Sequence, residues 1–237
     1  MVFFATFSNG ELPEYIKVCK RSDPDLYDCI SNSVETLKPK LRKGIPELNV
    51  PSMEPLPLGT LALNRGPQSA RVDFNITNLL VWGPSSFIIK SMNHDIPNYR
   101  FAFKVLLPKL HFKGQYSINM NVLLLKLKGR GLATGNITNY FGDVNMQGHK
   151  IIKDEKEYLQ FDKLNIKLKV GQTRFKLDNL FNGNPALGTL ANDVINQNSD
   201  LFIEEIKPAL EKSMSDIFTE AANNILNKFT FDELFPE

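Results

Sequence analysis

The sequence has few of the residue types on which enzymes and metal sites usually depend. Its 237 residues include three histidines, His94, His111 and His149, whose separation does not match the spacing of metal ligands. The Gly-x-Ser-x-Gly nucleophile elbow is absent, and no glycine-rich motif opens a helix as a dinucleotide-binding loop would. We therefore expect no enzymatic activity, no cofactor and no metal.

An excess of one charge and a long hydrophobic run are also missing. The 28 Lys and Arg balance 26 Asp and Glu, and the basic residues are scattered along the chain. A nucleic-acid partner would require a basic patch that neutralises phosphates, so none is expected. The longest apolar stretch, 79–89, is interrupted by Gly83 and Pro84 and falls short of the roughly 18 residues of a transmembrane helix. We therefore predict no membrane span.

The first ten residues are interpreted as the remnant of a signal peptide. The apolar run 2–7 is followed by the small or polar residues 8–10, although a basic n-region is missing and the run is shorter than a complete hydrophobic region. We expect residues 1–10 to be this remnant and residues 11–237 to form a single domain, since 42% apolar residues can fill a core. The protein is accordingly predicted to be secreted and extracellular.

The two cysteines and two sequons agree with secretion. The even count and close spacing of Cys19 and Cys29 favour one disulfide, and a pair of buried free thiols is the alternative. Asn75 and Asn136 each begin an Asn-x-Thr sequon, so both are candidate N-glycosylation sites.

The N-terminal part of the chain has a helical pattern followed by a proline-rich stretch. Asp23-Pro24 is typical of a helix start, and apolar residues recur at helical spacing over 26–37. This short helix is expected to end near Lys38, because Pro39 disfavours a helical conformation in the residue before it. The stretch 44–59 contains too many prolines for a helix or a central strand and is predicted to be an extended connector.

From about Thr60 to Leu177 the apolar residues alternate with polar ones. In the clearest segment, 109–124, even positions are apolar and odd positions are polar, and the apolar positions become odd from Leu123 onward. That change of phase predicts a β-bulge or a bend. One apolar and one polar face, without helical crossovers between strands, are typical of an antiparallel sheet.

The C-terminal third is predicted to be one long helix. Asn184-Pro185 resembles a helix start, and apolar residues three or four apart continue to Phe229. Pro208 predicts a kink, and the polar run 196–200 is a second weak point. A helix of roughly 44 residues would be about 65 Å long, whereas a compact sphere of this chain length has a diameter of about 45 Å. Either the helix breaks or the molecule is elongated.

These elements predict an α+β fold. The long helix is apolar around much of its circumference and must be covered from several sides, and antiparallel strands are the material available. We expect a strongly curved antiparallel sheet wrapped around the C-terminal helix, with the short N-terminal helix outside it. A layered α+β sandwich, which would cover one side of the helix, is the structural alternative.

Two N-terminal segments resemble the signature of the insect takeout and juvenile-hormone-binding protein family. They are YIKVCKRSDPDLYDCI at 15–30 and GIPELNVPSMEPL at 44–56, and shorter similar segments occur near 129–136, 184–188 and 231–235. The resemblance implies a curved sheet rolled around a long helix, with an internal apolar tunnel that carries a ligand. Hormone carriers of this family have a second disulfide nearer the C-terminus, which this chain cannot form. It therefore resembles the takeout branch more closely.

The resemblance also implies a role for the inward apolar residues. Periodic apolar residues normally pack as core, but in this family they would line the tunnel. The implied partner is a terpenoid, a fatty-acid-like molecule or another long-chain lipid, bound by a monomer. Alternatives are a membrane-surface or lipopolysaccharide-binding module and a protein-interaction partner that depends on ligand. The residues expected to line the tunnel are Trp82, Met92, Phe101, Phe103, Phe112, Tyr116, Ile118, Met120, Tyr140, Phe202, Met214 and Phe218.

Overall fold

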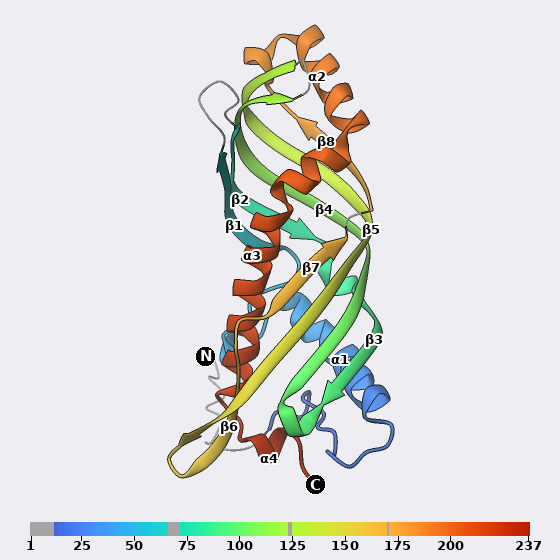
Figure 1. The fold of residues 1–237 in the computed structure, drawn as a ribbon, viewed down its shortest axis with the longest axis vertical. Coiled ribbons are helices and arrows are strands. Elements are labelled where there is room, and N and C mark those ends of the chain that lie inside the picture. Colours follow the sequence, from blue (N-terminus) through green and yellow to red (C-terminus); the bar gives the residue numbers. More distant parts are fainter. Residues whose placement is uncertain (1–11, 66–71, 123–124, 170) are drawn as a thin grey trace, which may run out of the picture.

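In the computed structural model, a strongly curved antiparallel sheet wraps around a long C-terminal helix (Figure 1). The structure describes residues 12–65, 72–122, 125–169 and 171–237, so the proposed signal-peptide remnant lies outside the described residues. The molecule is elongated, and the long helix follows much of its longest axis (Figure 1). The predicted α+β wrap is therefore confirmed, and the layered sandwich is not observed in the described ranges.

Two long central strands organise the sheet. β4 and β5 pair continuously from Arg100 opposite Gln147 to Val122 opposite Leu125, β1 and β2 extend the sheet from β4, and β3 also pairs with β4. β6, β7 and β8 all pair with β5. The strands are β1 (Leu56–Arg65), β2 (Val72–Trp82), β3 (Ile88–Asp95), β4 (Arg100–Val122), β5 (Leu125–Lys153), β6 (Lys156–Phe161), β7 (Asn165–Lys169) and β8 (Gln172–Leu177).

The alternation along β4 sorts its side chains as the sequence predicts. Leu110, Phe112 and Ile118 are buried, whereas the odd-numbered residues between them are exposed. The apolar positions change from even to odd near residue 123, but a bulge or bend within one strand is not the cause. Because Val122 pairs with Leu125, the residues on the two sides belong to two antiparallel strands, in which paired residues have opposite parity. The prediction of a bulge within one strand was wrong.

The N-terminal helix is longer than the sequence predicts. α1 spans Leu26–Lys43 and contains Pro39, so the expected end near Lys38 was wrong. Pro39 is exposed, and water can satisfy the single helical carbonyl that loses its donor. The helix ends instead at Gly44, whose φ of 82° is unfavourable for other residues. The 3-10 turns are η1 (Pro46–Leu48), η3 (Pro84–Ser86), η4 (Ile96–Asn98) and η5 (Phe181–Gly183).

The C-terminal helix is broken at one of its two predicted weak points. α2 (Pro185–Gln197) begins as expected, since Asn184 Oδ1 accepts a hydrogen bond from Leu187 N at 3.1 Å. The chain leaves the helical conformation at Asn198, and α3 (Ser199–Leu226) then continues through Pro208. A short α4 (Phe231–Leu234) follows. The helix therefore breaks and the molecule is also elongated.

Side chains of α2 and α3 bind the free edge of the sheet. Ser213 of α3 donates to Leu58 O of β1 at 3.2 Å, and Thr219 accepts from Leu164 N at 2.9 Å. Such contacts satisfy backbone groups that an uncovered edge would leave open. Three asparagines each bond both the N–H and the C=O of one residue of β6 or β8: Asn192 with Leu177, Asn196 with Phe175, and Asn223 with Phe161.

The N-terminal segment is fastened to the C-terminal end of the chain. Cys19 and Cys29 form a disulfide, which confirms the favoured prediction. Arg21, inside the disulfide loop, donates from Nε to Phe235 O at 2.6 Å, and its guanidinium carbon lies 5.0 Å from the ring centroid of Phe231. The disulfide loop therefore holds α4 against the body of the molecule, at the lower end in Figure 1.

Candidate functional site: an apolar cavity

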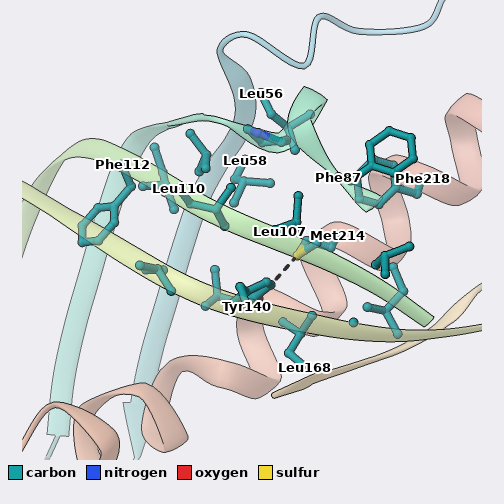
Figure 2. Close-up of a pocket in the computed structure, with 18 of the residues that line it drawn as sticks. Leu56, Leu58, Phe87, Leu107, Leu110, Phe112, Tyr140, Leu168, Met214 and Phe218 are labelled. Carbon is teal, nitrogen blue, oxygen red and sulfur yellow. Dashed lines mark hydrogen bonds between the residues drawn. The ribbon is translucent and has the colours of Figure 1, made fainter. Parts of the chain in front are cut away.

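A cavity of about 490 Å³ lies between the sheet and the helices. Its lining comes from β1 to β5, from β7 and β8, and from α1, α2 and α3. Most of these side chains are aliphatic or aromatic, as Figure 2 shows for a part of the wall. Among the described residues that line it, Glu205 is the only charged one and Tyr140 the only one with a hydroxyl. The chemistry of the site is therefore that of binding to apolar surface.

The cavity is long and narrow. On α3 its lining residues extend from Phe202 to Ile225, a span of roughly 35 Å at about 1.5 Å per helical residue. On β4 they extend from Phe103 to Ile118, roughly 50 Å along the curved strand. A cavity of this shape suits an extended molecule better than a globular one.

Tyr140 places one polar group in the apolar wall. Its hydroxyl donates to Met214 Sδ at 3.9 Å (Figure 2). Burial raises the pKa of this phenol well above its ordinary value, and the carboxylate of Glu211 raises the pKa further. The hydroxyl is therefore protonated at neutral pH and remains a donor. A thioether is a weak acceptor, so a ligand oxygen at this place would form a stronger hydrogen bond.

Seven of the twelve residues expected to line a tunnel line this cavity. They come from β4, β5 and α3, and the large ring of Phe112 fits because Gly135 lies opposite it. A Cβ atom at Gly135 would lie 2.4 Å from Cζ of Phe112. The seven are Phe103, Phe112, Ile118, Tyr140, Phe202, Met214 and Phe218.

Trp82 lies on the opposite face of the sheet. The pairing of β2 with β4 shifts between Thr77 and Leu80, at Asn78 with a φ of 51°. Beyond this irregularity the inward positions of β2 become odd, so Val81 lines the cavity and Trp82 packs outside. Its ring centroid lies 5.7 Å from that of His111.

Three other expected residues are buried outside the cavity wall. Phe101 belongs to an aromatic cluster at the lower end, 5.8 Å from Phe161 between ring centroids. Tyr116 donates its hydroxyl to Asp178 O at 2.7 Å, and Met92 is buried in β3. The side chain of Met120, the remaining expected residue, lies outside the described residues.

The wall also contains residues that the sequence did not assign to it. Ile30 and Val34 of α1 and Phe87, which precedes β3, all line the cavity. The helical spacing over 26–37 had shown an apolar face on α1, but it did not show which surface that face covers. Nothing in the pattern around Phe87 indicates its position, because that residue lies between a 3-10 turn and a strand.

The outward surface carries the two sequons. Asn75 and Asn136 are exposed, and Asn136 Oδ1 lies 3.2 Å from His111 Nδ1. In the described ranges, no three His, Cys, Asp or Glu side chains are arranged to hold a metal ion. Searched over the same ranges, no helix is both long and apolar enough to cross a membrane.

The geometry agrees with comparisons to known proteins. The chain is 24% identical over 235 residues to the circadian clock-controlled protein daywake of Drosophila melanogaster, covering 94% of this chain and 88% of daywake. It is 20% identical over 224 residues to a putative beta-carotene-binding protein of Schistocerca gregaria, covering 93% and 88%. The crystal structure of Epiphyas postvittana Takeout 1 superposes with a TM-score of 0.79 at 21% identity, covering 89% of this chain and 96% of that one.

A family model adds to these similarities. The model of the haemolymph juvenile hormone binding protein (JHBP) family matches residues 1–236, nearly the whole chain. The resemblance seen at 15–30 and 44–56 is thereby confirmed. A curved sheet around a helix, one N-terminal disulfide and this match lead to one conclusion: the chain belongs to the haemolymph juvenile hormone binding protein family.

Proposed function

We propose that this protein is a secreted carrier that binds a small, elongated hydrophobic molecule in its internal cavity. The observation that supports the proposal best is the long cavity with its apolar wall. Removing apolar ligand surface from water contributes about 25 cal/mol per Å², so an extended chain would bind without many polar contacts. The names of the family and of the locust relative refer to juvenile hormone and to beta-carotene, and we extend to this chain only the hydrophobic character of such ligands.

The wall suggests which hydrophobic molecules fit. A terpenoid, a fatty-acid-like molecule or another long-chain lipid fits within the length of the cavity. The hydroxyl of Tyr140 favours a ligand that carries an oxygen acceptor within its apolar chain over a pure hydrocarbon. We assign ligand contact to the seven expected residues that line the cavity, together with Ile30, Val34 and Phe87.

The proposal also covers the export of the protein, its single domain and its monomeric state. We infer that residues 11–237 form a single domain that is exported after removal of the preceding segment and acts as a monomer. The disulfide between Cys19 and Cys29 is typical of oxidising compartments, and the exposed Asn75 and Asn136 are accessible to glycosylation.

A displacement experiment tests the carrier function. The protein is freed of lipid by solvent extraction, refolded and titrated with the fluorescent fatty acid cis-parinaric acid, and native mass spectrometry of material from the original source identifies any copurifying molecule. We expect saturable binding of about one probe per chain and competition by long-chain terpenoids. Absence of both a copurifying lipid and saturable binding would disprove the proposal.

A further inference from the structure

The fold separates charges that are scattered in the sequence. Eleven exposed Lys and Arg lie on β4, β7, β8 and the first part of β5, up to Asp143. Asp143 is the only acidic residue in these parts of the sheet. By contrast, α2 and α3 contain seven Asp and Glu and two lysines, Lys207 and Lys212. The outer face of the sheet is therefore strongly basic, although the whole chain is nearly neutral.

A row of three apolar side chains, two exposed and one half-buried, crosses this basic face. Ile88 of β3 pairs with Leu106 of β4, which pairs with Phe141 of β5. Residues paired directly across neighbouring strands point to the same side of a sheet, and Val105 and Leu107, on either side of Leu106, line the cavity on the other side. Ile88 is 40% exposed and Phe141 is 43% exposed, which is unusual for such large apolar side chains.

Lysines surround the row. Phe141 pairs with Lys169 of β7, and Lys167 lies two residues away on the same face. Lys104 and Lys109 are exposed on β4 on either side of Leu106. Asp143 of β5 pairs with both Lys104 and Lys167, so the four lysines still leave an excess of positive charge around the row. The row Ile88, Leu106 and Phe141, with these four lysines and Asp143, is called the basic apolar face below.

We propose that the basic apolar face is a docking surface for an anionic lipid bilayer. Lysines near an anionic membrane are attracted to its surface potential, while exposed aromatic and aliphatic side chains are buried among the lipid headgroups. Docking in this orientation turns the acidic helices α2 and α3 away from the membrane, which avoids repulsion. A soluble polyanion would use the lysines but would gain nothing from Phe141. This property goes beyond the proposed carrier function, since it concerns the outside of the sheet.

Vesicle sedimentation tests the docking surface. Full-length, lipid-free protein is mixed with sucrose-loaded vesicles of phosphatidylcholine, or of phosphatidylcholine and phosphatidylserine at about 7:3, in about 0.1 M salt. We expect binding to the anionic vesicles alone, and loss of binding near 1 M salt, where the Debye length is about 3 Å. Phe141→Ser, and separately the pair Lys104→Glu and Lys169→Glu, should each reduce the bound fraction about tenfold.

Matched variants on the helices are the controls. Leu190→Ser replaces an exposed leucine of α2, and the pair Lys207→Glu and Lys212→Glu changes the same amount of charge on α3. Both should bind vesicles as the unchanged protein does. The proposal is overturned if the protein does not sediment with anionic vesicles. It is also overturned if charge reversal abolishes binding while Phe141→Ser has no effect and heparin competes, since the surface would then bind a soluble polyanion.

Ligand binding is measured in parallel on every variant. Since the altered side chains point away from the cavity, the affinity for cis-parinaric acid should stay within about twofold of the unchanged protein, which also shows that the variants fold. Docking without ligand and ligand binding without vesicles are separate readouts. A failure of the docking proposal would therefore leave the proposed carrier function intact, and the reverse also holds.

Discussion

Asn196 binds Phe175 as a neighbouring β-strand would. Its Oδ1 accepts a hydrogen bond from Phe175 N at 2.7 Å, and its Nδ2 donates to Phe175 O at 2.9 Å. The side-chain amide offers the same acceptor and donor as a backbone peptide, so a helix can take the place of a strand at the sheet edge. Asn192 repeats the arrangement at Leu177.

The first prediction concerns this edge. Asn196→Ala leaves the N–H and C=O of Phe175 without their partner, and we expect the free energy of unfolding to fall by about 2 kcal/mol or more. Urea denaturation followed by circular dichroism measures the change. Gln197→Ala, at the next and exposed position, is the control and should be nearly neutral. Equal stability of the two variants would show that the paired hydrogen bonds contribute nothing.

The second prediction concerns the polar group in the cavity. Tyr140→Phe keeps the ring and removes the hydroxyl, so affinity for a long-chain alcohol or ketone should fall about threefold to tenfold, the value of one hydrogen bond. Affinity for a hydrocarbon of equal length should not fall. Competition against cis-parinaric acid measures both, with Tyr158→Phe, outside the cavity wall, as the control. An equal loss for the two ligands would argue against a polar contact.

The third prediction uses the alternation of β5. Ile137 lines the cavity, whereas Asn136 points outward. Ile137→Trp should fill part of the cavity and weaken binding of a long-chain probe by about tenfold or more, at a cost in stability of about 1–3 kcal/mol. Asn136→Trp adds the same ring on the other face and should leave the affinity unchanged. Normal binding by Ile137→Trp would place the ligand elsewhere.

The fourth prediction concerns the disulfide. Replacing both Cys19 and Cys29 by serine opens a loop with a sequence separation of 10, and the chain-entropy relation predicts a loss of about 2.5–3 kcal/mol. The loop also positions Arg21 against α4, so the loss should be larger than this value. Combining the serine pair with Arg21→Gln in a double-mutant cycle measures that coupling. Strict additivity would mean that the loop does not hold Arg21 in place.

The fifth prediction concerns alkaline pH. Burial, and the nearby carboxylate of Asp178, raise the pKa of Tyr116 to about 12. In the unfolded chain this phenol has its ordinary pKa near 10, so between pH 10 and 12 the unfolded state loses the proton first. Stability should therefore fall as pH rises through this interval, and less steeply in Tyr116→Phe. Thermal unfolding from pH 9 to 11.5 measures it, and parallel curves for the two proteins would contradict the assignment.

Much of the architecture follows from the sequence because period and parity depend on local geometry. The alternation along β4 fixed which side chains face inward, and Asn184 fixed the start of α2. Parity failed for Trp82, since one irregularity at Asn78 reverses the faces of β2. The sequence also did not show which of the two predicted weak points would break the helix. The chain leaves the helical conformation at Asn198, whereas α3 continues through Pro208, because a helix tolerates the loss of one hydrogen bond when its other contacts hold it.

The extent of the cavity could not be derived in the same way. Tyr116 lies between Phe112 and Ile118 on the same face of β4, and both neighbours line the cavity while Tyr116 does not. Its hydroxyl is bound to Asp178, a residue 62 positions later. Similarly, the apolar stripe of α1 gave no sign that Ile30 and Val34 meet the cavity. Such contacts depend on tertiary packing between distant segments, which a local pattern does not contain.

The covered edge also bears on how molecules of this protein behave at high concentration. An open strand edge is a template on which a second chain can add, and repeated addition leads to amyloid-like aggregates. Here the amides of Asn192, Asn196 and Asn223 already occupy backbone groups of Leu177, Phe175 and Phe161. On the opposite side, β1 contains Pro57, which has no N–H to donate, and its pairing with β2 is irregular on both sides of Gly59. A sheet this long and this curved is thus protected against self-association at two of its boundaries.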